Sequence, residues 1–423
     1  MKFKESGRRR FLKNSAALAG LALGTIRSAV GETPEPDTHE GHSTDLKELI
    51  AYGERSRFVK SVRVPEGASS GSSPDKFGLT HHVLTPLQDQ LGMITPSPLH
   101  YIATHRGVFV PDIDPQQHRL TIHGMVDRPL EFSVEELKRL PLVSRIHYLE
   151  CNANKPKLSN KTVQESHGRT SCSEWTGVPL SVLLKEAGVQ SKATWIVAEG
   201  SDNNKGSYTI PLAKVLEDAL VAYGQNGEPI RPHQGFPLRL LVPGFEGINS
   251  VKWLRRIKLV DEVYMTFNEY DRYTSRQDPR ANSFNFEQGP KSVITFPSGD
   301  QKLPGRGFYE IAGLAWSGGG VVRKVEISTD GGRTWKDAPI KSAAHRMAHT
   351  RFAMDWNWDG RECVLLSRCT DELGQVQPSI EQFAKFWKVT PNDLLVSTPV
   401  SGHYNFMQPW KVTSNGSVEN AFA

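Results

Sequence analysis

Cys151 is the residue with the clearest chemical potential in the sequence. It follows the alternating run 145–150, which predicts a strand, and it opens the polar stretch 152–155. Loops at strand ends carry much of the chemistry of mixed α/β proteins. A thiolate in such a place can act as a nucleophile or as a soft metal ligand. From composition alone, an unreactive, buried thiol is equally well supported. The functional and the structural interpretation of Cys151 therefore both stay open at this point.

The cysteine pattern excludes several kinds of centre. Neither Cys151 nor Cys172 belongs to a Cys-x-x-Cys pair, and no Cys-x-x-Cys-His segment exists, so no c-type haem is attached to this chain. Four scattered cysteines also exclude an iron–sulfur cluster and a structural zinc site. Cys363 and Cys369 share one predicted strand, where extended chain separates them by about 20 Å, beyond disulfide reach. These two are expected to be small core residues.

Residues 80–290 predict a mixture of strands and helices that has to position the cysteine loop. Ser133 and Glu136 form the capping-box pattern of a helix start. A short apolar-faced helix is predicted over 180–187, closed by Gly188. The pattern is therefore α+β in this part of the chain.

Beyond about residue 305 the pattern becomes all-β, and we assign it to a second domain over 291–423. Val325 and Ile327 point to one face of a predicted strand, and the Thr-Asp-Gly-Gly segment 329–332 predicts a tight hairpin turn. Short strands at regular spacing are typical of an immunoglobulin-like β-sandwich.

The first 31 residues have the layout of an export signal. Arginines at 8–10 and the Phe-Leu-Lys that follows precede a weakly apolar stretch over 14–25 and a small-residue cleavage site at 28–31. This pattern is typical of a twin-arginine signal peptide, which predicts export to the periplasm. A basic amphipathic surface helix is the less favoured alternative. Residues 32–79 are polar and are assigned to a linker and extended arm.

Charge and length limit the number of domains and the kinds of partner that the exported protein can have. The chain has 423 residues and a formal net charge of +5, and the predicted signal holds seven basic residues against one acidic residue. Its removal takes the net charge to −1, which leaves no basic footprint for nucleic acid. The length predicts two or three domains. No run of about 18 uncharged apolar residues provides a membrane span.

Ordered motifs across residues 80–415 resemble the sulfite oxidase family of molybdenum-cofactor enzymes. They are Tyr148–Asn154, Glu174–Leu180, Ala222–Pro229, Gly235–Arg239, Val242–Gly244, Val251–Leu254, Val325–Trp335 and Gln375–Pro378. The resemblance implies an α+β (mixed α/β) molybdopterin domain followed by the all-β sandwich as a dimerisation domain. Within the family, the chain looks most like the molybdenum subunits of bacterial sulfur-oxidising (Sox) sulfane or sulfite dehydrogenases, on segments Ser144–His147, Leu303–Tyr309 and His403–Asn405.

The resemblance implies a molybdenum–molybdopterin cofactor and gives roles to individual residues. Cys151 would bind molybdenum as a thiolate beside the two dithiolene sulfurs of the pterin. Arg239 and Lys252 match positions that hold the pterin phosphate, and Asp202 matches a polar contact to the pterin. Without the resemblance, the two cations would be surface charges and the aspartate a turn residue.

Two further assignments depend on looser matches. Tyr273 matches a family tyrosine at the site of the substrate oxygen, with Tyr270 as the competing assignment and a core tyrosine as the structural alternative. His105 is placed against an Arg-Asn-His motif at the entry to the cofactor site.

Several arginines of the family pattern are missing. Lys155 and Pro156 stand where an arginine pair follows the cysteine, Gln234 replaces a histidine, and Asn249 replaces an arginine. Free sulfite is a compact dianion that suits an arginine clamp. These losses favour a different reduced sulfur substrate, such as sulfane sulfur on a carrier protein's cysteine.

The resemblance thus implies a periplasmic molybdenum oxidoreductase that oxidises a reduced sulfur compound with oxygen from water. Electrons would pass to a separate c-type cytochrome, and the chain would form a homodimer within a heterotetramer. The alternatives are an exported sulfoxide reductase of the same cofactor family, against which the second domain argues, and a cofactor-free binding protein on the same fold.

Overall fold

A computed structural model describes residues 55–56, 58–66, 82–103, 110–202, 206–278 and 281–422, without the side chains of 276–278 and 281. Ser61–Ala423 form one compact unit, and the described helices and strands all belong to it. The predicted signal peptide (1–31), most of the predicted linker and the segment with His105 lie outside the described residues.

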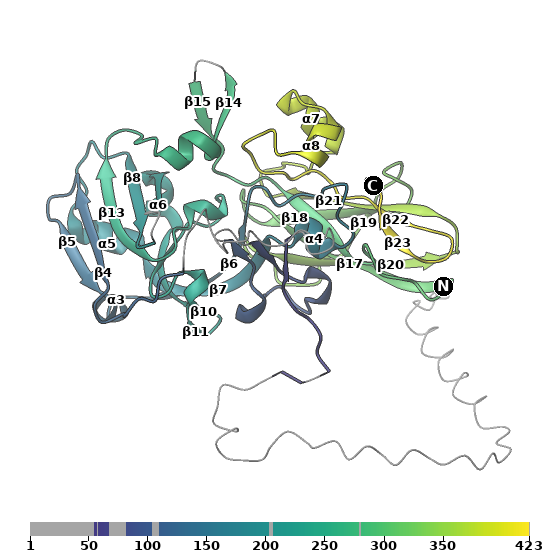
Figure 1. The fold of residues 1–423 in the computed structure, drawn as a ribbon, viewed down its shortest axis with the longest axis horizontal. Coiled ribbons are helices and arrows are strands. Elements are labelled where there is room, and N and C mark those ends of the chain that lie inside the picture. The colour runs from purple at the N-terminus through teal and green to yellow at the C-terminus, as the bar shows by residue number, and fades with distance from the viewer. Residues whose placement is uncertain are drawn as a thin grey trace, which may run out of the picture. The chain divides into compact units, whose positions relative to one another are not determined.

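The described residues of the first part of the chain form three sheets and the helices α3 to α6 (Figure 1). A small sheet has the order β1 (Val64–Pro65), β2 (His82–Leu84), β3 (Ile102–Ala103). A second has the order β11 (Glu228–Pro229), β10 (Leu220–Gln225), β7 (Thr170–Pro179), β6 (Val143–Glu150), with β12 (Arg239–Leu241) also paired to β10. The third has the order β5 (Leu130–Ser133), β4 (Arg119–Gly124), β13 (Leu254–Val260), β8 (Trp195–Gly200), β9 (Ser207–Pro211).

Helices pack on the third sheet around the largest apolar core. They are α3 (Val134–Lys138), α5 (Leu180–Ala187) and α6 (Leu212–Asp218), while α4 (Val163–His167) lies against the sandwich domain. Short helical turns are η2 (Leu87–Asp89), η3 (Ser97–Leu99), η4 (Pro232–Gln234), η5 (Gly247–Asn249) and the π-helical η6 (Glu269–Tyr273). Ser133 and Glu136 form the predicted capping box, and Gly188 ends α5 with φ of +72°, as predicted.

The second part of the chain is the predicted sandwich. After the ribbon β14 (Thr274–Asp278) and β15 (Ala281–Phe284), one sheet has the order β16 (Lys291–Phe296), β17 (Gly307–Trp316), β20 (Thr350–Trp358). The other has the order β19 (Lys336–Asp337), β18 (Val322–Ser328), β21 (Cys363–Asp371), β22 (Trp410–Val412), β23 (Val418–Asn420). Cys363 and Cys369 share β21, and all four cysteines are free.

Strand β6 joins the two domains. It pairs antiparallel with β7, with Tyr148 opposite Cys172. The side chains of both residues belong to the same apolar cluster as Trp316 and Trp410 of the sandwich. Cys151, the residue after β6, is therefore anchored by the cores of both domains.

Two C-terminal helices, α7 (Ile380–Trp387) and α8 (Pro391–Val396), form a separate apolar cluster with the tail residues Tyr404 and Phe406. Ser379 and Thr390 cap the two helices through capping boxes. In the described part of the chain, no helix is long and apolar enough to cross a membrane. The predicted fold class, a mixed molybdopterin-type domain followed by a sandwich, is confirmed.

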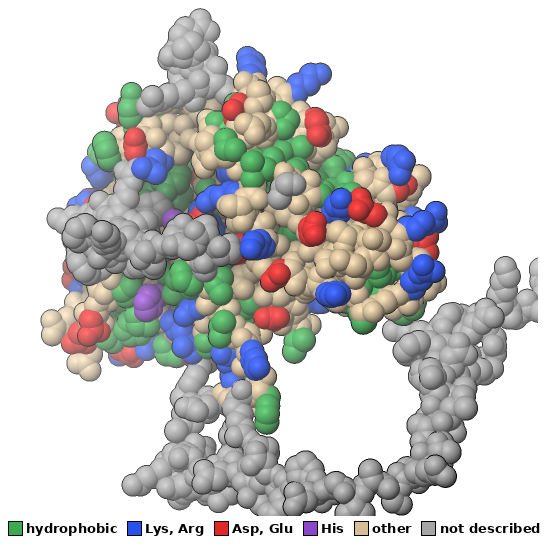
Figure 2. All heavy atoms as spheres, turned by 45° about the vertical axis from the view of Figure 1, so that its right-hand side comes forward, with side chains coloured by type: hydrophobic (Ala, Val, Ile, Leu, Met, Phe, Trp, Pro, Cys, Tyr) green, Lys and Arg blue, Asp and Glu red, His purple; other side chains and the backbone are tan. Residues whose placement is uncertain are grey.

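The surface of the described residues carries both signs of charge. Figure 2 shows basic and acidic side chains interspersed over the face it presents. Examples are the exposed pairs Lys324–Asp337 at 3.1 Å and Arg361–Asp359 at 2.6 Å. This face presents no single-signed stripe of the kind that nucleic acid binds.

Buried histidines are expected to make the protein sensitive to acid. Burial lowers the pKa of His147 to about 4 and that of His100 and His349 to about 3, against 6.5 for the unfolded chain. Between these values the unfolded chain holds protons that the folded protein does not. Stability should therefore fall as pH drops below 6.5, by up to about 1.4 kcal/mol per pH unit for each histidine. Burial raises the pKa of Glu246 to about 8, so between pH 4.5 and pH 8 the folded protein holds a proton there that the unfolded chain has lost. This proton offsets the effect of one of the histidines on stability.

Urea unfolding at about pH 5 and about pH 6.5 measures this slope. His349→Asn should reduce it by roughly one proton, because the asparagine does not titrate. An unchanged slope in the variant would contradict the assignment of His349 as a neutral buried group.

Candidate active site

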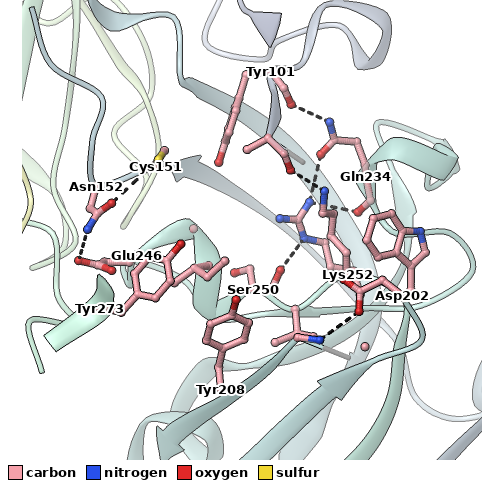
Figure 3. A pocket seen from close by; sticks show the side chains of 18 residues that line it. Tyr101, Cys151, Asn152, Asp202, Tyr208, Gln234, Glu246, Ser250, Lys252 and Tyr273 are labelled. Carbon is pink, nitrogen blue, oxygen red and sulfur yellow. Dashed lines mark hydrogen bonds between the residues drawn. The ribbon is translucent and has the colours of Figure 1, made fainter. Parts of the chain in front are cut away.

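A cavity opens beside Cys151, between the end of β6 and the loops of the third sheet (Figure 3). Five of the residues singled out from the sequence line it, namely Cys151, Asp202, Arg239, Lys252 and Tyr273. Tyr270, the competing tyrosine, is 52% exposed and is not among the lining residues. The geometry therefore favours Tyr273 over Tyr270. His105 lies outside the described residues.

The backbone of Cys151 is held on both sides of the loop. Its N–H donates to the carbonyl of Arg169 at 3.1 Å, and its carbonyl accepts from the N–H of Asn154 at 2.9 Å. The thiol lies 4.0 Å from Oδ1 of Asn152. Cys151 is partly exposed at the cavity wall, as a ligand for a bound group has to be.

Arg169 brings a positive charge to this sulfur that sequence reasoning missed. Its Nη1 lies 3.9 Å from Sγ of Cys151, while its Nη2 pairs with the carboxylate of Glu66. Glu66 also pairs with Lys157 at 2.9 Å, and these cations lower its pKa against the effect of burial. The family pattern has an arginine pair shortly after the cysteine, whereas this arginine lies 18 residues along, directly before β7. The cysteine therefore keeps a guanidinium neighbour from a different place in the sequence.

Glu150, directly before Cys151, is fully buried and accepts hydrogen bonds from four segments. The donors are Nδ2 of Asn154 at 2.8 Å, Nζ of Lys291 at 2.7 Å, Nε1 of Trp316 at 2.6 Å and Nε2 of His403 at 2.7 Å. Lys291 and His403 hold the pKa of Glu150 far below its ordinary value, although burial opposes this. The network ties the cysteine strand to β16, β17 and the C-terminal tail.

The opposite end of the cavity contains two cations, the buried Arg239 and the partly exposed Lys252, and neither has a carboxylate within ion-pair distance among the described residues. Arg239 donates to the carbonyls of Ser250 and Gln234, at 3.1 Å each, and to Oε1 of Gln234. Lys252 donates to the carbonyl of Ala103 at 2.8 Å. Burial lowers the pKa of Arg239 to about 10 and that of Lys252 to about 7. Cations in this state favour an anionic ligand, which supplies the missing charge.

Two residues that depart from the family pattern have structural roles here. Gln234 donates to the carbonyl of Tyr101 at 2.7 Å and accepts from Arg239, so it orients the guanidinium. Lys155 does not line the cavity; it donates to the carbonyl of Leu394 at 2.5 Å, at the end of α8. The lysine therefore anchors the C-terminal helices to the cysteine loop.

Asp202 accepts from the N–H of Gly206 at 3.0 Å and lines the cavity beside Lys252. Asp202 therefore stabilises a turn and also faces the cavity, so both interpretations of this residue from the sequence apply.

Glu246 was not identified from the sequence. It is buried in the cavity wall, and its carboxylate accepts a hydrogen bond from Nδ2 of Asn152 at 3.0 Å. Its only sequence signal is a charged residue between apolar neighbours.

The cavity can hold a group that is anionic at one end and needs a soft sulfur donor at the other. The thiol of Cys151 supplies the donor, and Arg239 with Lys252 supplies the anion site. In the part of the chain that is described, no cluster of three or more His, Cys, Asp or Glu gathers around a point. A metal here would accordingly need ligands from its own organic group besides the cysteine. These residues fit a molybdopterin, and their individual roles stay predictions.

Two family models match the chain. Residues 107–268 match the oxidoreductase molybdopterin binding domain, and residues 284–392 match the Mo-co oxidoreductase dimerisation domain. The sulfane dehydrogenase SoxCD from Paracoccus pantotrophus is similar in structure, with a TM-score of 0.82 and 34% sequence identity. That match covers 94% of this chain and 99% of the solved chain.

Plant nitrate reductases are similar over part of their length. The NADH enzyme of Cichorium intybus is 34% identical over 306 residues, and that of Arabidopsis thaliana is 33% identical over 391 residues. These matches cover 64% and 79% of this chain but 33% and 41% of the relatives. The chain thus spans well under half the length of these two relatives.

Proposed function

This chain belongs to the sulfite oxidase family of molybdopterin oxidoreductases, and from this premise we propose that it is a periplasmic dehydrogenase of reduced sulfur. Its substrate would be carrier-bound sulfane sulfur or sulfite, and its electrons would go to a c-type cytochrome. The observation that carries the proposal is the cavity that the thiol of Cys151 shares with two cations, Arg239 and Lys252, neither of which has a carboxylate within ion-pair distance among the described residues.

The residues of the cavity would divide the work between binding and chemistry. Cys151 would bind molybdenum, while Arg239 and Lys252 would hold the pterin phosphate and Asp202 the pterin. The bound cofactor would supply two-electron oxidation coupled to oxygen transfer from water. Tyr273, at the wall of the cavity, would orient the substrate oxygen, and the burial of the surrounding side chains would limit access of bulk water.

A sulfur substrate is supported by the extent of the structural similarity. The solved sulfane dehydrogenase is matched over nearly its whole length, whereas nitrate reductases are matched over a third to two fifths. Lys155, which stands at the position of the family's arginine pair, is turned toward α8 and brings no cation to the cavity wall. A cavity with fewer cations favours sulfur on a protein thiol over a free dianion.

Partners and location are inferred from the same similarities and from the sequence. The family model over 284–392 describes a dimerisation domain, which supports a homodimer, and the two-part name of the solved dehydrogenase supports a second subunit in a heterotetramer. The sequence pattern over 1–31 supports export through the twin-arginine route.

The proposal is tested with protein made in a host that synthesises the cofactor. We expect about one molybdenum per chain, and reduction of cytochrome c with a persulfidated carrier protein that is faster than with free sulfite. Nitrate reduction with a chemical electron donor is the comparison reaction. Protein without molybdenum, or nitrate turnover above sulfur turnover, would contradict the proposal.

A further inference from the structure

Glu246 is a buried acid in the cavity wall for which the cofactor assignments give no role. It precedes η5, and its backbone is fixed by hydrogen bonds of 2.9 Å to Phe286 and Asn249. Its carboxyl group accepts from Asn152, the residue after Cys151, at 3.0 Å (Figure 3). Among the described residues no cation pairs with it, which is unusual for a buried carboxyl group.

A second, smaller cavity is also lined by this side chain. It is lined by Glu246, Tyr273, Asn249, Glu269 and Asn285, among others. Glu246 and Tyr273 line both cavities and so form part of the wall between them. A carboxyl group in such a wall contacts both sides, and polar side chains beyond it can bind water.

We propose that Glu246 is the proton-transfer residue of this site, taking a proton from the water that supplies oxygen and passing it into the second cavity. This inference rests on the proposed function. In each two-electron oxidation of a thiolate-type sulfur, one S–O bond forms and both O–H bonds of a water break. Two protons leave, and two electrons pass singly to the external cytochrome. Glu246 takes up the first of these protons, passes it into the second cavity, and is then free to take up the second in the same way.

The surroundings of Glu246 suit this role. The walls next to it contain five other titratable groups from the part of the chain that the structure describes. They are Cys151 after β6, Tyr101 before β3, Tyr208 on β9, and Glu269 and Tyr273 on η6. Arg239, Lys252 and Asp202 line the same cavity at its far end. The carboxylate of Glu269 accepts hydrogen bonds from the side chain of Thr209 at 3.1 Å and from the N–H of Thr266 at 2.8 Å. Lys214, over the neighbouring ring of Phe245, is paired with Asp218 at 2.7 Å.

Burial raises the pKa of Glu246 to about 8, although the hydrogen bond from Asn152 lowers it. A base works best when its pKa lies near the working pH. The carboxylate is the active form, so turnover should rise with pH up to about 8 and then level off.

The test uses the molybdenum-loaded enzyme and its Glu246→Gln variant, which keeps an acceptor for Asn152. We expect kcat to fall by about 100-fold or more, with unchanged molybdenum content and loss of the rise toward pH 8. Glu246→Asp should restore part of the rate. Glu262→Gln, an exposed residue, serves as the matched control.

Infrared difference spectra between about pH 6 and pH 9 provide a readout independent of turnover. A protonated carboxyl band that titrates near 8 should be present in the wild type and absent in Glu246→Gln. Full activity in the variant, an unchanged band, or loss of molybdenum together with activity would each overturn the inference. A wild type that carries the band but oxidises no sulfur compound would instead overturn the proposed function.

Discussion

Cys151→Ser is expected to abolish turnover while leaving the fold intact. Loss of groups that merely support a metal ligand typically lowers affinity or activity by about 10–100-fold, so loss of the ligand itself should exceed 100-fold. The thiol is only partly buried and makes long contacts of 3.9 and 4.0 Å, so its replacement by a hydroxyl should change stability by less than about 1 kcal/mol. The measurements are cytochrome reduction and thermal unfolding.

Cys363→Ser is the matched control, because that thiol lies on β21 in the sandwich, away from the cavity. It should keep molybdenum and activity. A Cys151→Ser protein that turns over within a few fold of the wild type would contradict the assignment of this thiol as the ligand.

Glu150→Gln is expected to cause the largest loss of stability, about 3–5 kcal/mol. The substitution leaves the buried ammonium of Lys291 without its carboxylate and weakens the bonds to Trp316 and His403. Because Cys151 comes next in the chain, the thiol should also shift and the protein should lose molybdenum. Urea unfolding and molybdenum analysis measure the two effects.

A double variant that removes both charges distinguishes the effect of the ion pair on stability from the effect of the side chains' shape. Glu150→Gln combined with Lys291→Met should recover much of the lost stability, since the uncompensated charge is gone. Glu199→Gln, at a partly exposed pairing with Arg255 and Arg256, should cost about 1 kcal/mol or less. Equal losses in the single and double variants would show that Lys291 is not the reason for the effect.

The elements that position the site were predictable where local chemistry determines them. The alternation of 145–150 predicts β6, the capping box predicts the start of α3, and Gly188 predicts the end of α5. The Thr-Asp-Gly-Gly turn likewise predicts the hairpin of β18 and β19. These signals act over a few residues and need no knowledge of tertiary structure.

The polar contacts across the chain were not predictable in this way. Arg169 contacts Cys151 from the position directly before β7, and His403 contacts Glu150 from 253 residues away in the sequence. Lys155 looked like a remnant of an arginine site, and the structure turns it to Leu394. Each contact depends on how sheets and tail pack together, which no local pattern encodes.

The sandwich is part of the active site's support as well as a candidate dimer interface. Lys291 and Trp316 belong to its first sheet, and both bind the carboxylate before the cysteine. Detaching this domain would remove three of the four side-chain donors of Glu150, namely Lys291, Trp316 and His403. The catalytic domain alone is therefore expected to be a poor host for the cofactor.

X-ray absorption at the molybdenum K-edge tests the assignment of Cys151 as the metal ligand most directly. We predict molybdenum with three sulfur neighbours in the purified protein, two from the pterin and one from Cys151, falling to two in Cys151→Ser. The absence of molybdenum from protein made in a cofactor-competent host, or the same sulfur count in both proteins, would contradict the assignment.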